Sequence, residues 1–233
     1  MCPARGPRRS RGSALIRPRG DERVGEAMSE ARDLRIANGT ISAIVLAGGR
    51  SSRFGSDKLA AVVGDGTLLD AAVGGASSIA GDIVVVVAPG GAGRQVGDRS
   101  VKIVEDPEPF GGPLIGLLAG LAAVAHPMVV VVGGDMPTLG GAVLRLMVGT
   151  LGADGAVAAV VLGREGRPQP LPAVIRTGAA IDAGRRLMAD GERSLRSLFD
   201  ELATRVLGEE EWRPLDPDGR TLHDVDTPAD LES

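Results

Sequence analysis

The sequence predicts an α/β fold with a doubly wound, mostly parallel sheet and helices on both faces. Short apolar runs rich in β-branched residues alternate with longer helical patterns, as expected of strands joined by crossover helices. The clearest strand is the unbroken run at residues 83–87, which is typical of a central parallel strand. Ligands bind such sheets at the carboxyl ends of the strands, so functional residues are expected in the loops that follow them.

Each element from residue 41 onward has a local justification. Thr67 is a suitable N-cap for a helix at residues 68–79, and Ser194 for a helix that ends at residue 202. Pro113 fits the first position of a helix at residues 113–125, where its missing N–H is not needed. The other expected helices are 140–151 and 179–190, and the other expected strands are 41–46, 101–104, 128–132, 156–162, 171–175 and 205–207.

The composition indicates a soluble globular protein with a substantial core. Of 233 residues, 43% are hydrophobic and 24% are charged, which suits one or at most two domains. Residues 1–38 are rich in Arg, Gly, Pro and Ser and have no apolar periodicity. We expect them to be a disordered extension, or a start assigned too early with Met28 as the true start. Residues 39–233 are expected to form a single domain.

Charge and aromatic content argue against a nucleic-acid partner or a membrane. The first 20 residues hold six arginines and no acidic residue, so the rest of the chain is more acidic than its net charge of −4 suggests. Three Phe, one Trp and no Tyr offer little for base stacking. The uncharged run at 109–134 is long enough to span a bilayer, but Pro127 divides it into a helical and a strand pattern.

The single cysteine, Cys2, fits a reducing compartment, and we expect the protein to be cytoplasmic.

The loop after the first strand has the features of a triphosphate site. Residues 46–59 read Leu-Ala-Gly-Gly-Arg-Ser-Ser-Arg-Phe-Gly-Ser-Asp-Lys-Leu. Gly48 and Gly49 would let backbone N–H groups approach a ligand, while Arg53 and Lys58 would neutralise its charge. The string is not a P-loop, because five residues rather than four separate Gly49 from Gly55. A solvated turn remains the alternative when the loop is considered alone.

Two carboxylates follow later strands. Asp106 ends the strand near residue 104 and precedes Gly111 and Gly112, whose N–H groups could face the same edge of the sheet; a simple turn is the alternative. Asp135 follows the strand at 128–132 and precedes Pro137. A carboxylate at a central strand end can hold Mg²⁺, which takes one or two carboxylates together with substrate phosphates and waters.

The whole string at 46–59 resembles the signature of the MobA-like nucleotidyltransferases, Leu-Ala-Gly-Gly-x-Ser-x-Arg-Met-Gly-x-Asp-Lys, with Phe54 in place of Met. The resemblance continues in Glu105-Asp106 with the following Gly-Pro-Leu, in Asp135-Met-Pro, and in Asp226-Thr-Pro, where the family usually has Asn-Thr-Pro. It covers residues 41–232 and is greatest to the molybdenum cofactor guanylyltransferases. It implies a Rossmann-like, GT-A-like nucleotidyltransferase fold.

The resemblance implies roles for particular residues. Lys58, Arg53 and Asp135 would be catalytic, and Asp135 with Asp226 would bind Mg²⁺. The acceptor would be bound by Arg167 and Gln169 in Arg164–Pro172 and by Arg193 and Ser194, with an exposed hairpin as the alternative for the first segment. The nucleotide-binding residues would be Leu46, Ala47, Gly48, Gly49, Lys58, Asp106, Gly111, Gly112 and Asp135.

The implied reaction is Mg²⁺-dependent transfer of GMP from GTP to the phosphate of molybdopterin, with release of pyrophosphate and transient contact with cofactor-delivery proteins or molybdoenzymes. Gly48-Gly49 favours GTP, because relatives that use CTP tend to carry Ala-Ala-Gly. The family's Asn at the end of the second strand is replaced by residues 86–89, Val-Val-Ala-Pro, so base recognition would rest more on backbone groups. The alternatives are cytidylyl transfer to the same cofactor, nucleotidyl transfer to another phosphorylated acceptor, and a silent nucleotide-binding or interaction domain.

Overall fold

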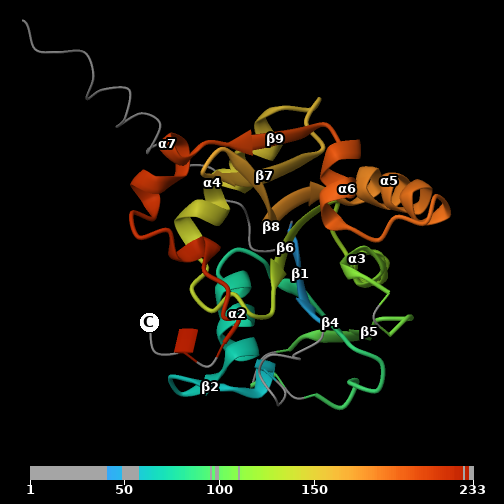
Figure 1. Ribbon diagram of the computed structural model, residues 1–233, viewed down its shortest axis with the longest axis vertical. Coiled ribbons are helices and arrows are strands. Elements are labelled where there is room, and N and C mark those ends of the chain that lie inside the picture. Colours follow the sequence, from blue (N-terminus) through green and yellow to red (C-terminus); the bar gives the residue numbers. More distant parts are fainter. Residues whose placement is uncertain are drawn as a thin grey trace, which may run out of the picture. The chain divides into compact units, whose positions relative to one another are not determined.

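A seven-stranded sheet with the strand order β5-β4-β1-β6-β8-β7-β9 forms the centre of the computed structural model (Figure 1). The strands are β1 (Ser42–Ala47), β4 (Asp82–Val87), β5 (Lys102–Glu105), β6 (Met128–Gly133), β7 (Ala159–Arg164), β8 (Arg167–Arg176) and β9 (Thr204–Leu207), and a separate two-stranded sheet joins β2 (Val62–Val63) to β3 (Gly66–Thr67). The structure describes residues 41–48, 58–94, 96–97, 100–109, 111–227 and 229–230. All of them belong to one unit, residues 35–233.

The sheet is mostly parallel, as predicted. β5, β4, β1 and β6 run in one direction, and β7 and β9 are parallel to each other. Among the described strands of the seven-stranded sheet, only β8 is reversed, because it pairs antiparallel with both β6 and β7. β7 and β8 are joined by a tight turn in which Glu165 and Gly166 have φ of 52° and 72°. The hairpin that was the alternative for this segment is therefore present.

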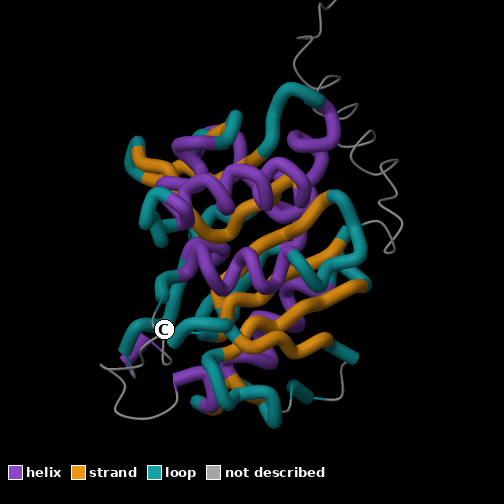
Figure 2. The backbone as a smooth tube through the Cα atoms, turned by 90° about the vertical axis from the view of Figure 1, so that its right-hand side faces the viewer, coloured by secondary structure: helices purple, strands orange, loops and turns teal. Residues whose placement is uncertain are grey.

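Helices cover both faces of the sheet. α2 (Leu68–Ser77) and α4 (Gly141–Ala153) pack on one face, and α3 (Pro113–Leu121), α5 (Thr177–Ala189) and α6 (Leu195–Glu201) pack on the other (Figures 1 and 2). Successive strand residues point to opposite faces, so Val85 and Val87 join the α2 and α4 core while Val84 and Val86 join the α3 core. The short elements are α7 (Glu209–Trp212) and the 3₁₀ turns η1 (Lys58–Ala60), η2 (Arg213–Leu215) and η3 (Arg220–Leu222).

The local signals in the sequence explain where the helices begin. The Thr67 hydroxyl accepts a hydrogen bond from the Asp70 N–H, and the Asp70 carboxylate accepts one from the Thr67 N–H, which completes a capping box. Ser194 caps α6 in the predicted way, and Pro113 opens α3. The expected helix at 113–125 stops earlier, at Leu121. α7 and the β2–β3 hairpin were not predicted.

The uncharged run at 109–134 is divided as expected between a helix and a strand, since it supplies α3 and β6. Within the described part of the chain, every helix falls short of the length and apolarity that crossing a membrane requires.

Candidate functional site

The carboxyl ends of β1, β4, β5 and β6 meet at one edge of the sheet. Two backbone hydrogen bonds extend the strand pairing past the last strand residues: the Gly134 N–H donates to the Leu46 carbonyl at 2.9 Å, and the Asp106 N–H donates to the Val87 carbonyl at 2.8 Å. These bonds hold the loops after β6 and β5 in line with the loop after β1. The predicted residues Gly48, Asp106 and Asp135 are therefore brought to the same edge.

Lys58 connects two carboxylates at this edge. Its ammonium Nζ lies 3.0 Å from Asp135 Oδ2 and 3.1 Å from Asp226 Oδ1. The Lys58 side chain is 12% exposed, whereas those of Asp135 and Asp226 are 35% and 56% exposed. Burial acts to lower the pKa of Lys58, but the hydrogen bonds and charges of Asp135 and Asp226 outweigh it and hold the pKa above its usual value. Lys58 is therefore a permanent cation at neutral pH.

Close packing at the end of β6 orients Asp135. A Cβ on Gly133 would lie 2.5 Å from Asp135 Oδ1, so the carboxylate lies over a position that only glycine leaves open. The carbonyl of Asp135 accepts a hydrogen bond from the Val225 N–H at 2.9 Å. The backbone of Asp135 is thus hydrogen-bonded to the C-terminal segment that carries Asp226.

The C-terminal segment is anchored on the loop between β6 and α4. Thr221 is fully buried, and its hydroxyl accepts a hydrogen bond from the Gly140 N–H at 3.1 Å. The Thr138 hydroxyl donates to the carbonyl of Arg220 at 2.8 Å, and Val225 is 1% exposed. These contacts fix the path of residues 220–225. As a result the exposed Asp226 lies across the Lys58 ammonium from Asp135.

The pair of carboxylates fits a divalent cation. Asp135 and Asp226 already converge on one positive charge, the Lys58 ammonium, from two segments of the chain. In the described part of the chain, no group of three or more His, Cys, Asp or Glu side chains could hold a metal by itself. A two-carboxylate site is what Mg²⁺ uses when phosphates and waters complete its coordination.

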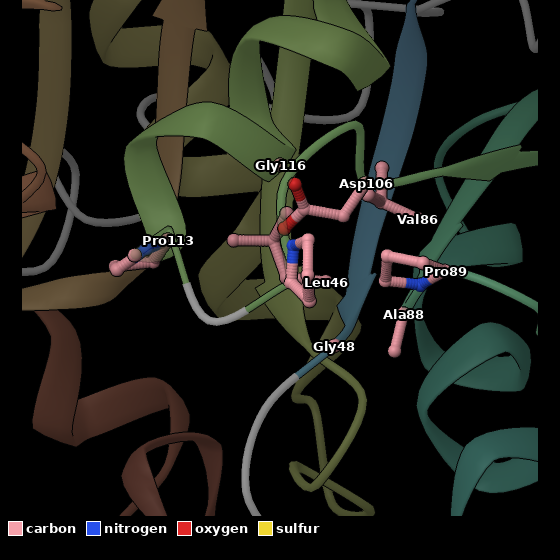
Figure 3. Close-up of a pocket in the computed structure, with 10 residues that line it drawn as sticks. Leu46, Gly48, Val86, Ala88, Pro89, Asp106, Pro113 and Gly116 are labelled. Atoms are coloured by element: carbon pink, nitrogen blue, oxygen red, sulfur yellow. The ribbon is translucent and has the colours of Figure 1, made fainter.

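A cavity of about 450 Å³ lies beside this centre, at the ends of β1, β4 and β5 (Figure 3). Its lining is mainly apolar, and Asp106 is the only charged residue among the described residues that line it. Figure 3 shows the Asp106 carboxylate pointing towards Gly116 on α3. A Cβ at Gly116 would lie 3.2 Å from Asp106 Oδ2. The lining residues are Leu46, Gly48, Val86, Ala88, Pro89, Asp106, Pro109, Gly112, Pro113 and Gly116.

Leu46, Gly48, Asp106 and Gly112 are thus predicted nucleotide-binding residues that the structure places in the cavity wall. Ala47 instead belongs to the core on the α2 face, as the alternation of a strand requires. Gly111 forms the turn before α3, where its N–H donates to the Glu108 carbonyl.

Part of the predicted site lies outside the described residues. Gly49, Arg53 and the remainder of the glycine loop to residue 57 belong to that part, so their roles stay predictions.

The four predicted acceptor residues occupy two places. Arg167 and Gln169 begin β8, and the Gln169 amide donates to the Arg167 carbonyl at 3.2 Å. Arg193 lies beside the cavity instead: its carbonyl accepts the Leu114 N–H, and its Cβ is 2.8 Å from where a Cβ on Gly112 would be. The Arg193 guanidinium turns back to the Met188 carbonyl at the end of α5. The Ser194 hydroxyl caps α6.

Sequence reasoning missed the α3 wall of the cavity. Pro109, Pro113 and Gly116 line it, and none of them was assigned a binding role. The signal was present in Gly116, which lies one helical turn after the Gly111-Gly112 pair, on the side of α3 that faces the strand ends.

The chain is similar to known proteins over most of its length. Residues 43–206 match the model of the MobA-like NTP transferase domain family. A probable molybdenum cofactor guanylyltransferase of Chloroflexus aggregans is 34% identical over 196 residues, covering 82% of this chain and 92% of that protein. A molybdenum cofactor guanylyltransferase of Desulfosudis oleivorans is 28% identical, covering 82% and 93%.

A solved structure shares the fold. The crystal structure of molybdopterin-guanine dinucleotide biosynthesis protein A from Archaeoglobus fulgidus superposes with a TM-score of 0.68 at 22% identity, covering 82% of this chain and 95% of that one.

Proposed function

Because the chain belongs to the MobA-like NTP transferase family, and so is a nucleotidyltransferase, we propose that it transfers GMP from GTP to the phosphate of molybdopterin and releases pyrophosphate. The names of the guanylyltransferase relatives support the donor and the acceptor. The observation that carries the proposal is the Lys58 ammonium, held between Asp135 and Asp226 next to a nucleotide-sized cavity.

Lys58 has the donor count that this role requires. An ammonium group has three N–H donors, and the two carboxylates use two of them. The third is left for a phosphate oxygen of the nucleotide. The raised pKa of Lys58 keeps the group charged throughout the neutral range, so it would stabilise negative charge on the triphosphate together with Arg53.

The cavity at the ends of β1, β4 and β5 would hold the nucleoside. Its apolar walls suit a base, and Asp106 would accept hydrogen bonds from the ribose or the base. Ala88 and Pro89 line it where the family usually places an Asn, so the backbone groups of the wall would supply the remaining polar contacts.

Transfer needs positioning and charge neutralisation more than covalent catalysis. An oxygen of the acceptor phosphate would attack the α-phosphorus, the bond from that phosphorus to the β-bridging oxygen would break, and pyrophosphate would leave. Asp135 and Asp226 would hold Mg²⁺, which when bound supplies further neutralisation of phosphate charge. Arg167, Gln169, Arg193 and Ser194 would contact the acceptor. A single cysteine, Cys2, suits a reducing compartment, and we place the reaction in the cytoplasm. Transient contact with molybdoenzymes or cofactor-delivery proteins would occur there.

Nucleotide selectivity is the first experiment. We expect GTP with Mg²⁺ to raise the melting temperature, while ATP, UTP and CTP at the same concentration raise it less. A ligand at 100 times its dissociation constant adds about 2.7 kcal/mol of stability, which is readily measured. A selective response to CTP would move the donor assignment to cytidylyl transfer. No response to any nucleotide would favour the silent binding or interaction domain.

The metal assignment has its own test. Asp135→Ala should abolish Mg²⁺-dependent transfer, because it removes one of two carboxylates at the centre, while circular dichroism and thermal unfolding remain close to wild type. Asp182→Ala on the exposed face of α5 is a matched control that keeps full activity. Full activity of the Asp135→Ala protein would contradict the assignment.

A further inference from the structure

The carboxylate of Asp226 is exposed and lies near the end of the described chain. Its side chain is 56% exposed, whereas Val225 before it is 1% exposed. An exposed side chain keeps its rotamer freedom unless local contacts restrict it. The Asp226 carboxylate therefore needs a firmly held backbone if it is to stay beside the Lys58 ammonium.

The backbone around Asp226 is held on both sides. On the N-terminal side, the Val225 N–H donates to the Asp135 carbonyl at 2.9 Å. On the C-terminal side, the N–H of Asp226 itself donates to Asp230 Oδ2 at 3.0 Å. The first contact joins the segment to the loop after β6. The second joins it to a carboxylate four residues further along the chain.

One oxygen of Asp230 accepts three hydrogen bonds. Besides the Asp226 N–H, Asp230 Oδ2 accepts the Thr227 N–H at 2.7 Å and the Thr227 hydroxyl at 3.0 Å. Hydrogen bonds to an ionised acceptor are shorter and stronger than those between neutral groups. The Asp230 N–H donates in turn to the Thr227 carbonyl at 3.1 Å, which closes the turn.

One of these bonds goes beyond what a helical turn requires. In a capping box, the carboxylate at the third helical position accepts the N–H of the capping residue, and Thr227 occupies that place relative to Asp230. Asp226 lies one residue before the cap, where the capping box binds no N–H. The Asp230 carboxylate therefore fixes the residue that carries the candidate metal ligand, in addition to the turn that follows it.

We propose that Asp230 is a positioning residue, which holds the Asp226 carboxylate opposite Asp135 through the backbone of Asp226. The inference rests on the proposed function, in which Asp135 and Asp226 hold Mg²⁺. Asp230 acts without touching the ion, because its Oδ2 is engaged with the backbone and the Thr227 hydroxyl. Mg²⁺ demands near-ideal octahedral geometry, so displacement of one carboxylate weakens its binding.

The test measures metal binding and does not depend on turnover. The full chain, saturated with a non-hydrolysable GTP analogue, is titrated with Mn²⁺ as the probe, and electron paramagnetic resonance separates free from bound ion. We expect Asp230→Ala to weaken Mn²⁺ binding by about tenfold or more, as loss of a residue that orients a ligand does. Asp230→Glu should stay within about twofold of the wild type, because glutamate at this position can also reach back to the cap.

Asp218→Ala is the charge-matched control. Asp218 belongs to the same C-terminal segment, and its side chain is 75% exposed. This variant should bind Mn²⁺ as the wild type does. Unchanged melting temperatures and unchanged stabilisation by the GTP analogue would show that the single variants are folded.

A double-mutant cycle separates positioning from a general effect of charge. Asp226→Ala should weaken Mn²⁺ binding by itself. Adding Asp230→Ala to that protein should then cost no further affinity, because the carboxylate that Asp230 positions has been removed. An equal loss from Asp230→Ala in both backgrounds would overturn the proposal, as would wild-type Mn²⁺ affinity in the single Asp230→Ala protein.

Failure of the proposed function gives a different result. Either the wild type would bind no Mn²⁺ with the GTP analogue, or the Asp226→Ala protein would bind it as tightly as the wild type does. Amide hydrogen exchange of Asp226, measured by NMR without metal or nucleotide, then decides the positioning role. Exchange at least about tenfold faster in the Asp230→Ala protein would support that role, and unchanged exchange would overturn it.

Discussion

At the scale of single residues, Gly133 controls the position of a carboxylate. Gly133→Ala would place a methyl group 2.5 Å from Asp135 Oδ1 and 3.3 Å from Met136 Cγ. The Asp135 side chain can rotate away, so we expect the fold to persist. Because a displacement of about 1 Å can cost roughly 100-fold in rate, we expect kcat to fall by about 10- to 100-fold.

Steady-state kinetics and thermal unfolding of the same preparation would check this expectation. Wild-type kcat in the Gly133→Ala protein would show that the orientation of Asp135 has little effect on the reaction. The metal assignment itself is tested separately by the Asp135→Ala protein.

The individual site residues differ in how far the sequence could predict them. Lys58 and Asp135 follow strands, and strand ends meet at one edge, so their proximity was predictable in outline. The bridge from Lys58 to both carboxylates was not predictable, because it depends on how Thr221 and Val225 anchor the C-terminal segment. The contact of Thr221 with Gly140 spans 81 positions of the chain and that of Val225 with Asp135 spans 90, so no local sequence pattern could predict them.

At the scale of elements, two helical glycines with different surroundings predict opposite effects of the same substitution. A Cβ at Gly149 in α4 would meet nothing within 4 Å, whereas a Cβ at Gly75 in α2 would lie 2.7 Å from Leu139 Cβ. Gly149→Ala should stabilise the protein by about 0.5–1 kcal/mol, because alanine loses less backbone entropy in a helix. Gly75→Ala should destabilise it by roughly 1–3 kcal/mol through overpacking.

Urea unfolding of both variants would measure the two signs. Because α4 lies on the side of the sheet away from the α3 wall of the nucleotide cavity, Gly149→Ala should also leave GTP stabilisation unchanged. A destabilised Gly149→Ala protein would mean that the space around this position is smaller than the structure shows.

The direction of strand β8 could not be predicted from its sequence pattern. The β-branched pattern of β8 predicts a strand, but a continuous apolar run reads the same in either direction. Its reversal follows from the two-residue turn at Glu165 and Gly166, which is too short for the crossover that a parallel neighbour requires. The turn glycine was a usable signal. The short helix α7 could not be predicted from an apolar pattern, because only one of its residues, Trp212, is buried, where it packs against β7.

At the scale of the whole molecule, the edge of the sheet opposite the site is held by a partly buried polar network around Asp82, whose side chain is 13% exposed. Its carboxylate accepts hydrogen bonds from the Ser42 hydroxyl at 2.6 Å, the Lys102 ammonium at 2.8 Å and the Ala125 N–H at 2.8 Å. Three strands, β1, β4 and β5, and the loop before β6 are joined at one side chain. The described fold thus has an apolar interior, one edge that carries the candidate site and an opposite edge that this network stabilises.

This network predicts how stability depends on pH. Burial acts to raise the pKa of Asp82, but the hydrogen bonds from Lys102, Ser42 and Ala125 outweigh it and lower the pKa to about 2. Because the folded pKa lies below the unfolded value, the stabilisation is complete above about pH 4 and is lost as the pH falls towards 2. Asp82→Asn should therefore be less stable than wild type by about 1–2 kcal/mol at pH 7, with the difference shrinking between pH 4 and pH 2. Urea unfolding at pH 7, 4 and 3 would measure it, with Asp182→Asn as the exposed control; a difference that stays constant with pH would show that the charge of Asp82 is not its source.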